Sequence, residues 1–157
     1  MIKVNLVAVG KVKEKYFADG ISEYAKRLSK FCEFKITEIQ EENFKSVDDA
    51  LISVIKEKEG EKILPHLKGK VVAMAIEGKK YSSEKLADTL KEVCDVGGGV
   101  ITFVIGGSYG LSNTIKNRAD ILMSFSDMTF PHTLFRLMLT EQIYRAFSIN
   151  SNSPYHK

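Results

Sequence analysis

Residues 100–111 (VITFVIGGSYGL) constrain the fold of this chain more than any other segment. Six apolar or β-branched residues in a row are followed by three glycines within five positions. Such an apolar run is typical of a strand buried on both faces, as in a parallel sheet covered by helices. Ligands of these sheets bind at the carboxyl ends of the strands, where glycines let a backbone approach closely. The segment therefore predicts a strand that leads into a ligand-binding loop.

The remainder of the chain alternates between strand and helix patterns, which predicts an α/β fold with a mostly parallel sheet flanked by helices. The other predicted strands are residues 2–9, 33–39, 71–76 and 121–125. Three helices are predicted over residues 11–31, from Ser112 to residue 118, and over residues 132–149. Another is predicted to start with Ser46 as N-cap and Asp49 in its first turn. A fifth is predicted between an N-cap at Ser82 or Ser83 and the glycines 97–99 that end it.

Composition excludes several classes of protein. The 157 residues, 44% of them hydrophobic and 27% charged, predict one globular domain over residues 1–157 rather than a disordered chain. No apolar stretch approaches the ~20 residues that cross a bilayer, so no membrane partner is expected. Cys32 and Cys94 form no CxxC pair, and with no signal peptide they predict reduced thiols at core or near-core positions in a cytoplasmic protein. His66, His132 and His156 show no metal-ligand spacing, so no metal site is expected.

The glycine loop matches neither common nucleotide motif. It lacks the Lys-Ser/Thr pair of a P-loop, and its GGxxG spacing differs from GxGxxG. Two interpretations stay open on these residues alone: a tight strand-to-helix turn, and a site for a small nucleotide-like ligand. The net charge of +3 permits an anionic partner without requiring one.

Two helices carry faces that suggest partners. The polar face of residues 11–31 holds Lys13, Lys15, Lys26, Arg27 and Lys30, which fits either a solvated face or one that faces RNA. The helix over residues 132–149 is apolar around most of its circumference, which indicates burial on more than one side. In a domain of this size, a second copy of the chain would supply the additional contact.

Several long segments are shared with a known family. They are residues 103–112 (FVIGGSYGLS), 124–132 (SFSDMTFPH), 141–147 (EQIYRAF), 154–157 (PYHK) and an N-terminal VGKVKEKY. Over its whole length the chain resembles the ribosomal RNA large subunit methyltransferase H family of the SPOUT class. The resemblance implies an α/β sheet with a C-terminal deep trefoil knot, a homodimer whose active site is completed across the interface, and S-adenosylmethionine as cofactor. It also implies methylation at N3 of a pseudouridine in helix 69 of 23S rRNA, on the assembled ribosome.

The resemblance places the cofactor on three loops. The implied contacts are Met74, Gly106, Phe125, Ser126, Asp127, Met128, Thr129 and Phe130. This chain departs from the usual family pattern at Met74, where Leu is common, at Asp127, where Lys is common, and at Ser151-Asn152, which replace Arg-Gly. The Asp127 change matters only if that side chain meets RNA.

Removal of the N3 proton requires a base or a group that stabilises the resulting anion. His156 is the first candidate because an imidazole titrates near neutral pH. Tyr155 is expected to stack on or hydrogen-bond the base, and Arg145 to hold a phosphate or the developing anion. The alternatives are a disordered tail and an ion pair between Arg145 and Glu141. His132 is expected to organise the start of its helix. A non-catalytic ribosome- or RNA-binding protein of the same fold is the rival function.

Overall fold

A computed structural model describes residues 1–96 and 98–157 of the chain, so the predicted role of Gly97 lies outside the described residues. Strands and helices alternate from end to end. The strands are β1 (Ile2–Val9), β2 (Cys32–Ile39), β3 (Lys70–Lys80), β4 (Val100–Ile105) and β5 (Ile121–Ser124). The helices are α1 (Lys15–Leu28), α2 (Asp49–Ile63), the 3₁₀ turn η1 (Leu64–His66), α3 (Ser83–Asp95), α4 (Asn113–Arg118) and α5 (His132–Asn150).

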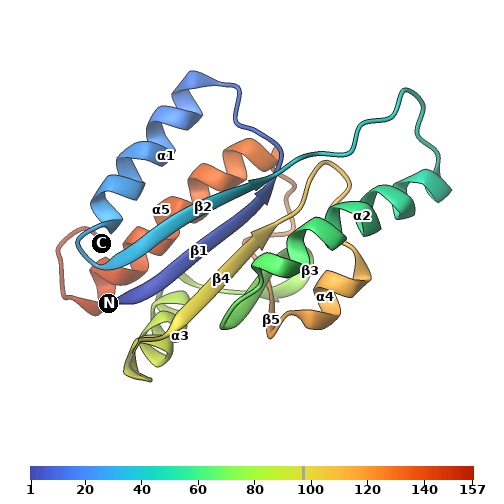
Figure 1. The fold of residues 1–157 in the computed structure, drawn as a ribbon. Coiled ribbons are helices and arrows are strands. Elements are labelled where there is room, and N and C mark those ends of the chain that lie inside the picture. Colours follow the sequence, from blue (N-terminus) through green and yellow to red (C-terminus); the bar gives the residue numbers. More distant parts are fainter. Residues whose placement is uncertain (97) are drawn as a thin grey trace.

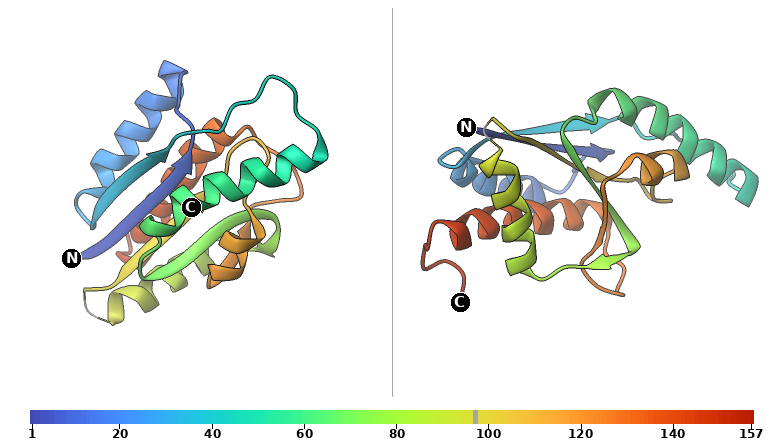
Figure 2. Two further views of the ribbon diagram at one scale, coloured as in Figure 1. Left: turned by 45° about the vertical axis from the view of Figure 1, so that its right-hand side comes forward. Right: turned by 90° about the horizontal axis from the view of Figure 1, so that it is seen from below.

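The five strands form one sheet in the order β2-β1-β4-β3-β5, and every pairing in it is parallel (Figure 1). The predicted α/β class and parallel sheet are therefore confirmed. Helices α1, α3 and α5 cover one face, and α2 and α4 cover the other, as the two views of Figure 2 show. All carboxyl ends of the strands point to one edge, which is where the loops of a binding site gather.

The strands contribute alternate residues to two hydrophobic layers, as the period of a pleated strand requires. In β4, Phe103 faces the layer that includes α3 and α5, whereas Val104 faces the layer that includes α2 and α4. Both side chains are completely buried. This two-sided burial explains why residues 100–105 read as an unbroken apolar run.

Strand β3 is longer and less regular than predicted. It continues past Ile76 to Lys80, and its pairing with β5 shifts register between Met74 and Lys79, both of which lie opposite Met123. The intervening residues leave the ladder as a large bulge, so that Ile76 is 52% exposed. An apolar pattern alone does not reveal such a bulge, because the pattern ends where the side chains turn toward solvent.

Two local predictions are corrected. Helix α2 begins at Asp49 and is capped by Asp48, whose carboxylate accepts from the backbone N–H of Leu51 at 2.8 Å, rather than by Ser46. A charged cap also interacts favourably with the helix dipole. Helix α1 begins at Lys15 and ends at Leu28, and so is shorter at both ends than residues 11–31.

The two cysteines differ in their environments. Cys32 is buried as predicted, and burial raises the pKa of its thiol to about 12. Cys94 is exposed, so the prediction of a core position is wrong. It follows Val93, which faces the core, and one residue further along a helix turns the side chain by about 100° toward solvent.

The apolar circumference of α5 is largely covered within the chain. The helix packs on the sheet and between α1 and α3, and a Cβ at Gly20 of α1 would lie only 2.9 Å from Leu137. Burial on several sides is thus confirmed, but it does not by itself require a second copy.

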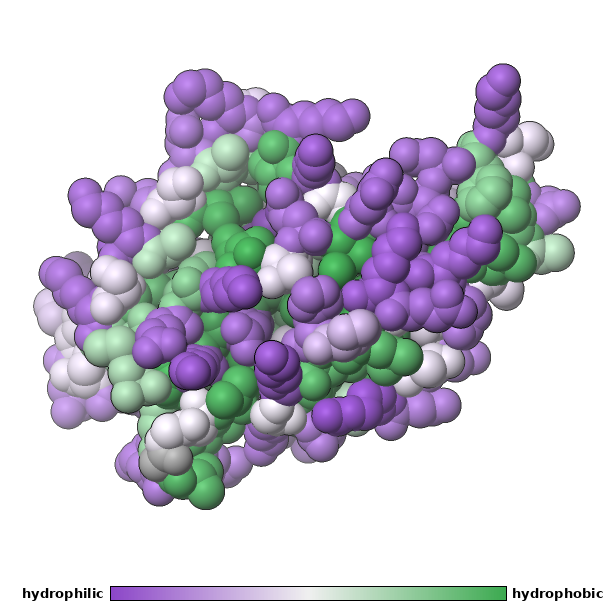
Figure 3. Space-filling model, viewed as in Figure 1, coloured by the Kyte–Doolittle hydropathy of each residue, from purple (hydrophilic) through white to green (hydrophobic). Residues whose placement is uncertain are grey.

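Figure 3 shows hydrophilic side chains over most of one face of the molecule. Within the described ranges, no helix combines the length and hydropathy needed to span a membrane.

Candidate functional site

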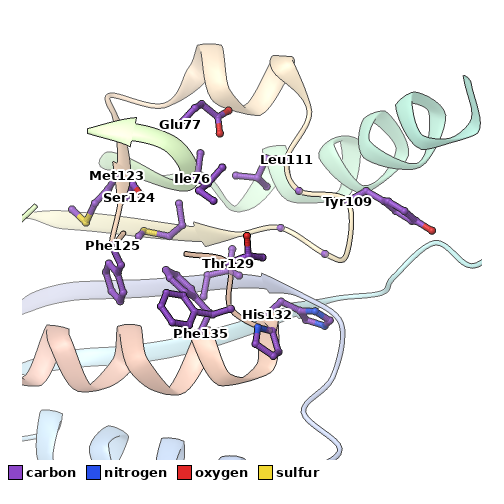
Figure 4. Close-up of a pocket in the computed structure, with 18 of the residues that line it drawn as sticks. Ile76, Glu77, Tyr109, Leu111, Met123, Ser124, Phe125, Thr129, His132 and Phe135 are labelled. Atoms are coloured by element: carbon purple, nitrogen blue, oxygen red, sulfur yellow. The ribbon is translucent and has the colours of Figure 1, made fainter. Parts of the chain in front are cut away.

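A cavity of about 520 Å³ lies at the carboxyl ends of β3, β4 and β5, beside the first turn of α5 (Figure 4). Its walls come from five segments: the β3 bulge, the end of β4 with the glycine loop after it, α4, the end of β5 with the loop after it, and α5. Apolar side chains such as Met74, Ile105 and Phe135 alternate with polar ones such as Glu77 and Thr129. Its size and mixed lining fall in the range of sites for small organic ligands.

The glycine loop closes on itself at the cavity wall. The N–H of Gly110 donates to the carbonyl of Gly107 at 3.0 Å, and Gly110 has a φ of +86°. A Cβ at Gly106 would lie 2.7 Å from the carbonyl carbon of Gly110, closer than side chains tolerate. Glycine at position 106 therefore serves the closure of the loop, and it also leaves that wall of the cavity without a side chain.

The β3 bulge supplies the opposite wall. Glu77 pairs with Lys116 of α4 at 2.5 Å, and both residues line the cavity. The ammonium group of Lys116 lowers the pKa of Glu77, so the carboxylate is charged at neutral pH. The hydrophobic pattern of the sequence indicated neither Glu77 nor Lys116 as a site residue. Both are polar, and the two lie far apart in the sequence.

Seven of the eight residues expected to contact the cofactor line this cavity: Met74, Gly106, Phe125, Ser126, Met128, Thr129 and Phe130. The eighth, Asp127, points away from it. Its side chain is 83% exposed and pairs with Lys80 at 2.7 Å. If Asp127 serves the site, it does so through the backbone of its loop or through a partner outside the chain.

Hydrogen bonds between residues close in sequence shape the loop after β5. Ser124 donates from Oγ to the carbonyl of Ser126 at 3.0 Å, and the Ser126 hydroxyl accepts from the N–H of Met128 at 2.8 Å. Phe125 stacks at a tilt on Phe135, with ring centroids 4.7 Å apart. The loop is thereby fixed against the first turns of α5, although its sequence shows no helical or strand period.

The three predicted catalytic residues form a second cluster, joined to Glu141 of α5 and Glu84 of α3. Arg145 donates to Glu141 at 2.6 and 3.0 Å, so the ion pair considered as the alternative to a role in binding phosphate or the anion is present. Nη1 of Arg145 lies 3.1 Å from Nδ1 of His156. Tyr155 donates to Glu141 at 3.0 Å, and Nε2 of His156 lies 2.9 Å from Glu84. In this structure the tail is docked rather than disordered.

These bonds fix the chemistry of the cluster. Because a guanidinium only donates, Nδ1 of His156 accepts, and the proton of a neutral ring belongs on Nε2, where it is donated to Glu84. Burial and the hydrogen bonds to Tyr24 and Glu141 raise the pKa of Tyr155. Its phenol therefore stays protonated at neutral pH and can donate a hydrogen bond but not act as a base.

The cluster and the cavity lie apart within one chain. Arg145, Tyr155 and His156 are absent from the cavity walls, whereas His132, at the first residue of α5, lines them. Residues 132 and 145 are separated by roughly 20 Å along the helix axis. The structure thus brings the predicted cofactor residues together and the predicted catalytic residues together, at different places on α5.

Comparison with known proteins gives this geometry a family. The protein-family model described as "predicted SPOUT methyltransferase" matches residues 2–156. The chain belongs to the SPOUT methyltransferase family. Proteins called ribosomal RNA large subunit methyltransferase H match over 159 aligned residues, which cover 99% of this chain and 100% of each relative. The identity is 49% for the protein from Latilactobacillus sakei and 48% for that from Clostridioides difficile.

Solved structures of low sequence identity share the SPOUT fold of this chain. A probable methylase family protein from Haemophilus influenzae is 13% identical, with a TM-score of 0.54 over 99% of this chain and 70% of its own. A Legionella pneumophila protein described as a methyltransferase, solved with the bound cofactor SAM, is 12% identical, with a TM-score of 0.50 over 93% of this chain and 66% of its own. At these identities the likeness concerns the fold alone.

Proposed function

We propose that this protein transfers a methyl group from S-adenosylmethionine to N3 of a pseudouridine in helix 69 of 23S rRNA, on assembled ribosomes in the cytoplasm. The main support is the convergence of seven expected cofactor contacts on one cavity at the carboxyl edge of the sheet. The substrate class, rRNA of the large ribosomal subunit, is supported by relatives that are about half identical to this chain. These relatives are named as large-subunit rRNA methyltransferases.

The residues of the cavity fit an adenosyl cofactor. Its volume of about 520 Å³ lies within the range of ~300–1,000 Å³ that suits small organic ligands. Met74, Phe130 and Phe135 offer apolar walls for a planar base, and the bare backbone at Gly106 allows close approach. Glu77 and Lys116 add one negative and one positive charge, which suits the charged amino-acid end of the cofactor.

S-adenosylmethionine, when bound, supplies a methyl group already activated on a sulfonium. The protein then has to position the two reactants and handle one proton. Phe125 and Phe130 are the partly buried apolar side chains of the β5 loop that limit the access of water to the cofactor side of the reaction. Arg145 stabilises the anion that forms when N3 loses its proton, and His156 accepts that proton at Nδ1 once Arg145 releases it.

The separation of cluster and cavity supports a homodimer as the working unit. Because Arg145, Tyr155 and His156 do not reach the cavity of their own chain, we propose that the tail cluster of one subunit completes the cavity of the other. Leu134 and Met138 of α5 remain only partly buried and are available for such a contact.

Two measurements test this function. Calorimetry with S-adenosylmethionine is expected to show binding, and its absence would count heavily against the proposal. Radiolabelled cofactor is then incubated with the protein and with ribosomes that lack the modification. Label is expected at one pseudouridine of 23S rRNA. Cofactor binding without any label would favour a non-catalytic RNA-binding protein of the same fold.

A further inference from the structure

A second, smaller cavity lies directly beside the first. It has a volume of about 280 Å³ and is lined by the end of β3, the start of α3, β5 and the middle of α5. Met123 and Phe125 line both cavities, and Figure 4 shows these two side chains next to β5 at one end of the larger one. A ligand in the smaller cavity would therefore adjoin the proposed cofactor site through two side chains.

The smaller cavity combines one aromatic ring with an oriented amide. Tyr81 lines it, and a phenol ring offers a flat surface on which a base can stack. Ser83 donates to Oε1 of Gln142 at 2.7 Å, and Nε2 of Gln142 donates to Glu141 at 3.1 Å. These bonds orient the carboxamide but leave one N–H and one lone pair of Oε1 for a ligand. Such a donor and acceptor side by side suit the amide-like edge of a nucleobase.

Two lysines stand beside this cavity. Nζ of Lys85 lies 4.5 Å from the centre of the Tyr81 ring, and the ammonium group of Lys85 lowers the pKa of Lys79. Neither lysine pairs with a carboxylate in the parts of the chain that the structure describes, whereas Lys80 between them in sequence pairs with Asp127. Adjacent like charges favour an anionic ligand, and phosphates of RNA bind lysines in this way.

The smaller cavity also adjoins the tail cluster. Glu84, next to Ser83 in α3, holds Nε2 of His156 at 2.9 Å, and Glu141 holds both Gln142 and Tyr155. Within one chain, the smaller cavity thus lies between the proposed cofactor cavity and the tail cluster. In the proposed dimer, that tail cluster serves the cofactor cavity of the partner subunit.

We propose that this second cavity binds a nucleobase of the RNA substrate, stacked on Tyr81 and hydrogen-bonded by Gln142, with the neighbouring phosphates on Lys79 and Lys85. The inference rests on the proposed function, which supplies RNA as the ligand. It goes further in naming the surface of this chain that positions the RNA, apart from the cofactor loops and the tail.

Kinetics on ribosomes that lack the modification test the site. Tyr81→Leu removes the ring but keeps an apolar side chain, and it is expected to raise KM for ribosomes about tenfold or more, since stacking on aromatic side chains dominates such contacts. Tyr81→Phe is expected to recover most of that loss. The double variant Lys79→Gln/Lys85→Gln is expected to raise KM and to reduce the salt dependence of binding by about two counterions. Affinity for S-adenosylmethionine, measured by calorimetry, should stay unchanged in each variant.

A control variant and a crosslink locate the effect at this cavity. Lys35→Gln removes an exposed charge on β2, at the opposite edge of the sheet, and should leave KM unchanged. Ultraviolet crosslinking of the wild-type protein to the same ribosomes should place a nucleotide adduct on the tryptic peptide of residues 81–85. Because Lys79 is exposed and Lys85 is only partly buried, the lysine variant stays informative even if Tyr81→Leu fails to fold.

The outcomes are distinct. Wild-type protein that neither binds the cofactor nor labels ribosomes overturns the proposed function and this inference together. Active wild-type protein with an unchanged KM in the tyrosine and lysine variants, or with adducts only outside residues 79–86, overturns this inference alone. So does sedimentation in which these substitutions dissociate a dimer, because the cavity would then be an interface between copies.

Discussion

The hydroxyl of Tyr155 donates to Oε1 of Glu141 at 3.0 Å and so ties the C-terminal tail to the middle of α5. The same hydroxyl lies 3.0 Å from that of Tyr24 on α1, which must act as the donor because the proton of Tyr155 is already used. The Tyr155 ring also packs edge-on against Tyr144, with centroids 4.9 Å apart. One tail residue thereby joins two helices that are distant in the sequence.

Tyr155→Phe tests the contribution of this contact to stability. The variant keeps the packing but removes a hydrogen bond to a charged acceptor, which we expect to lower the free energy of unfolding by about 1 kcal/mol. Urea denaturation at a fixed protein concentration measures the change. Tyr16→Phe is the matched control, since Tyr16 is 69% exposed. Equal midpoints for the two variants would mean that the tail is not docked in solution.

Gly106→Ala tests the closure of the glycine loop. Its Cβ would meet the backbone of Gly110, which cannot yield as a side chain does, so a loss of about 1–3 kcal/mol in stability is expected, as for other overpacked sites. Gly20→Ala is the contrasting variant, because its Cβ would meet only the flexible end of Leu137. Thermal unfolding should show a clear loss for the first variant and little change for the second. Similar melting temperatures would contradict the strained closure.

The fold was largely predictable because hydrophobic periodicity follows burial. Residues 6–9 and 101–105 are buried on both faces of a parallel sheet, and each range is an unbroken run of apolar or β-branched residues. Where structure depends on contacts distant in the sequence, prediction failed. In the bulge of β3, Met74 and Lys79 both pair with Met123 of β5, and neither sequence shows this pairing on its own. Helix α2 is capped by Asp48 rather than by Ser46, although both residue types are good N-caps. The trefoil knot is a property of the chain path and stays a prediction.

The site was predictable only through resemblance. No periodicity marks Phe125–Phe130 as a ligand loop, and Tyr155 and His156 alone read as a polar tail. The resemblance supplied these residues, but it did not show that Asp127 points away from the cavity or that His156 is held between Arg145 and Glu84. Glu77 and Lys116 were missed because their pairing at the cavity wall arises only in the folded chain.

His156→Ala tests the proposed proton acceptor. Loss of a positioned acid–base group is expected to slow methyl transfer about 100-fold or more. The affinity for S-adenosylmethionine should not change, because His156 is assigned to the proton of the RNA base and not to the cofactor. Single-turnover transfer of label to ribosomes and calorimetry measure the two quantities. His66→Ala, on the exposed η1 turn, is the control. Turnover equal to that of the control would remove His156 from the mechanism.

Met138→Glu tests the proposed role of α5 in a dimer. A charge in an apolar interface is costly to desolvate, so the variant is expected to sediment as a monomer at concentrations where the wild type is a dimer. Val96→Glu introduces the same charge at a residue that is 77% exposed and should not affect association. A dimer that survives Met138→Glu would place the interface elsewhere.

Glu59 predicts a pH dependence of stability. Its side chain is only 3% exposed, and burial raises its pKa above the ordinary value of 4.5. Between those two pKa values the folded state binds more protons than the unfolded state, so this group lowers stability as the pH rises through that interval. Glu59→Gln keeps an acceptor for the N–H of Glu42, which Glu59 now binds at 3.1 Å, but cannot ionise.

The free energy of unfolding of Glu59→Gln relative to wild type is therefore expected to increase from pH 4.5 upward and to level off above the raised pKa. Chemical denaturation across this range measures the difference, in which the contributions of the other carboxylates cancel. Glu61→Gln, exposed on the same helix, should give a flat difference. A flat difference for Glu59→Gln as well would show that the Glu59 carboxylate reaches solvent.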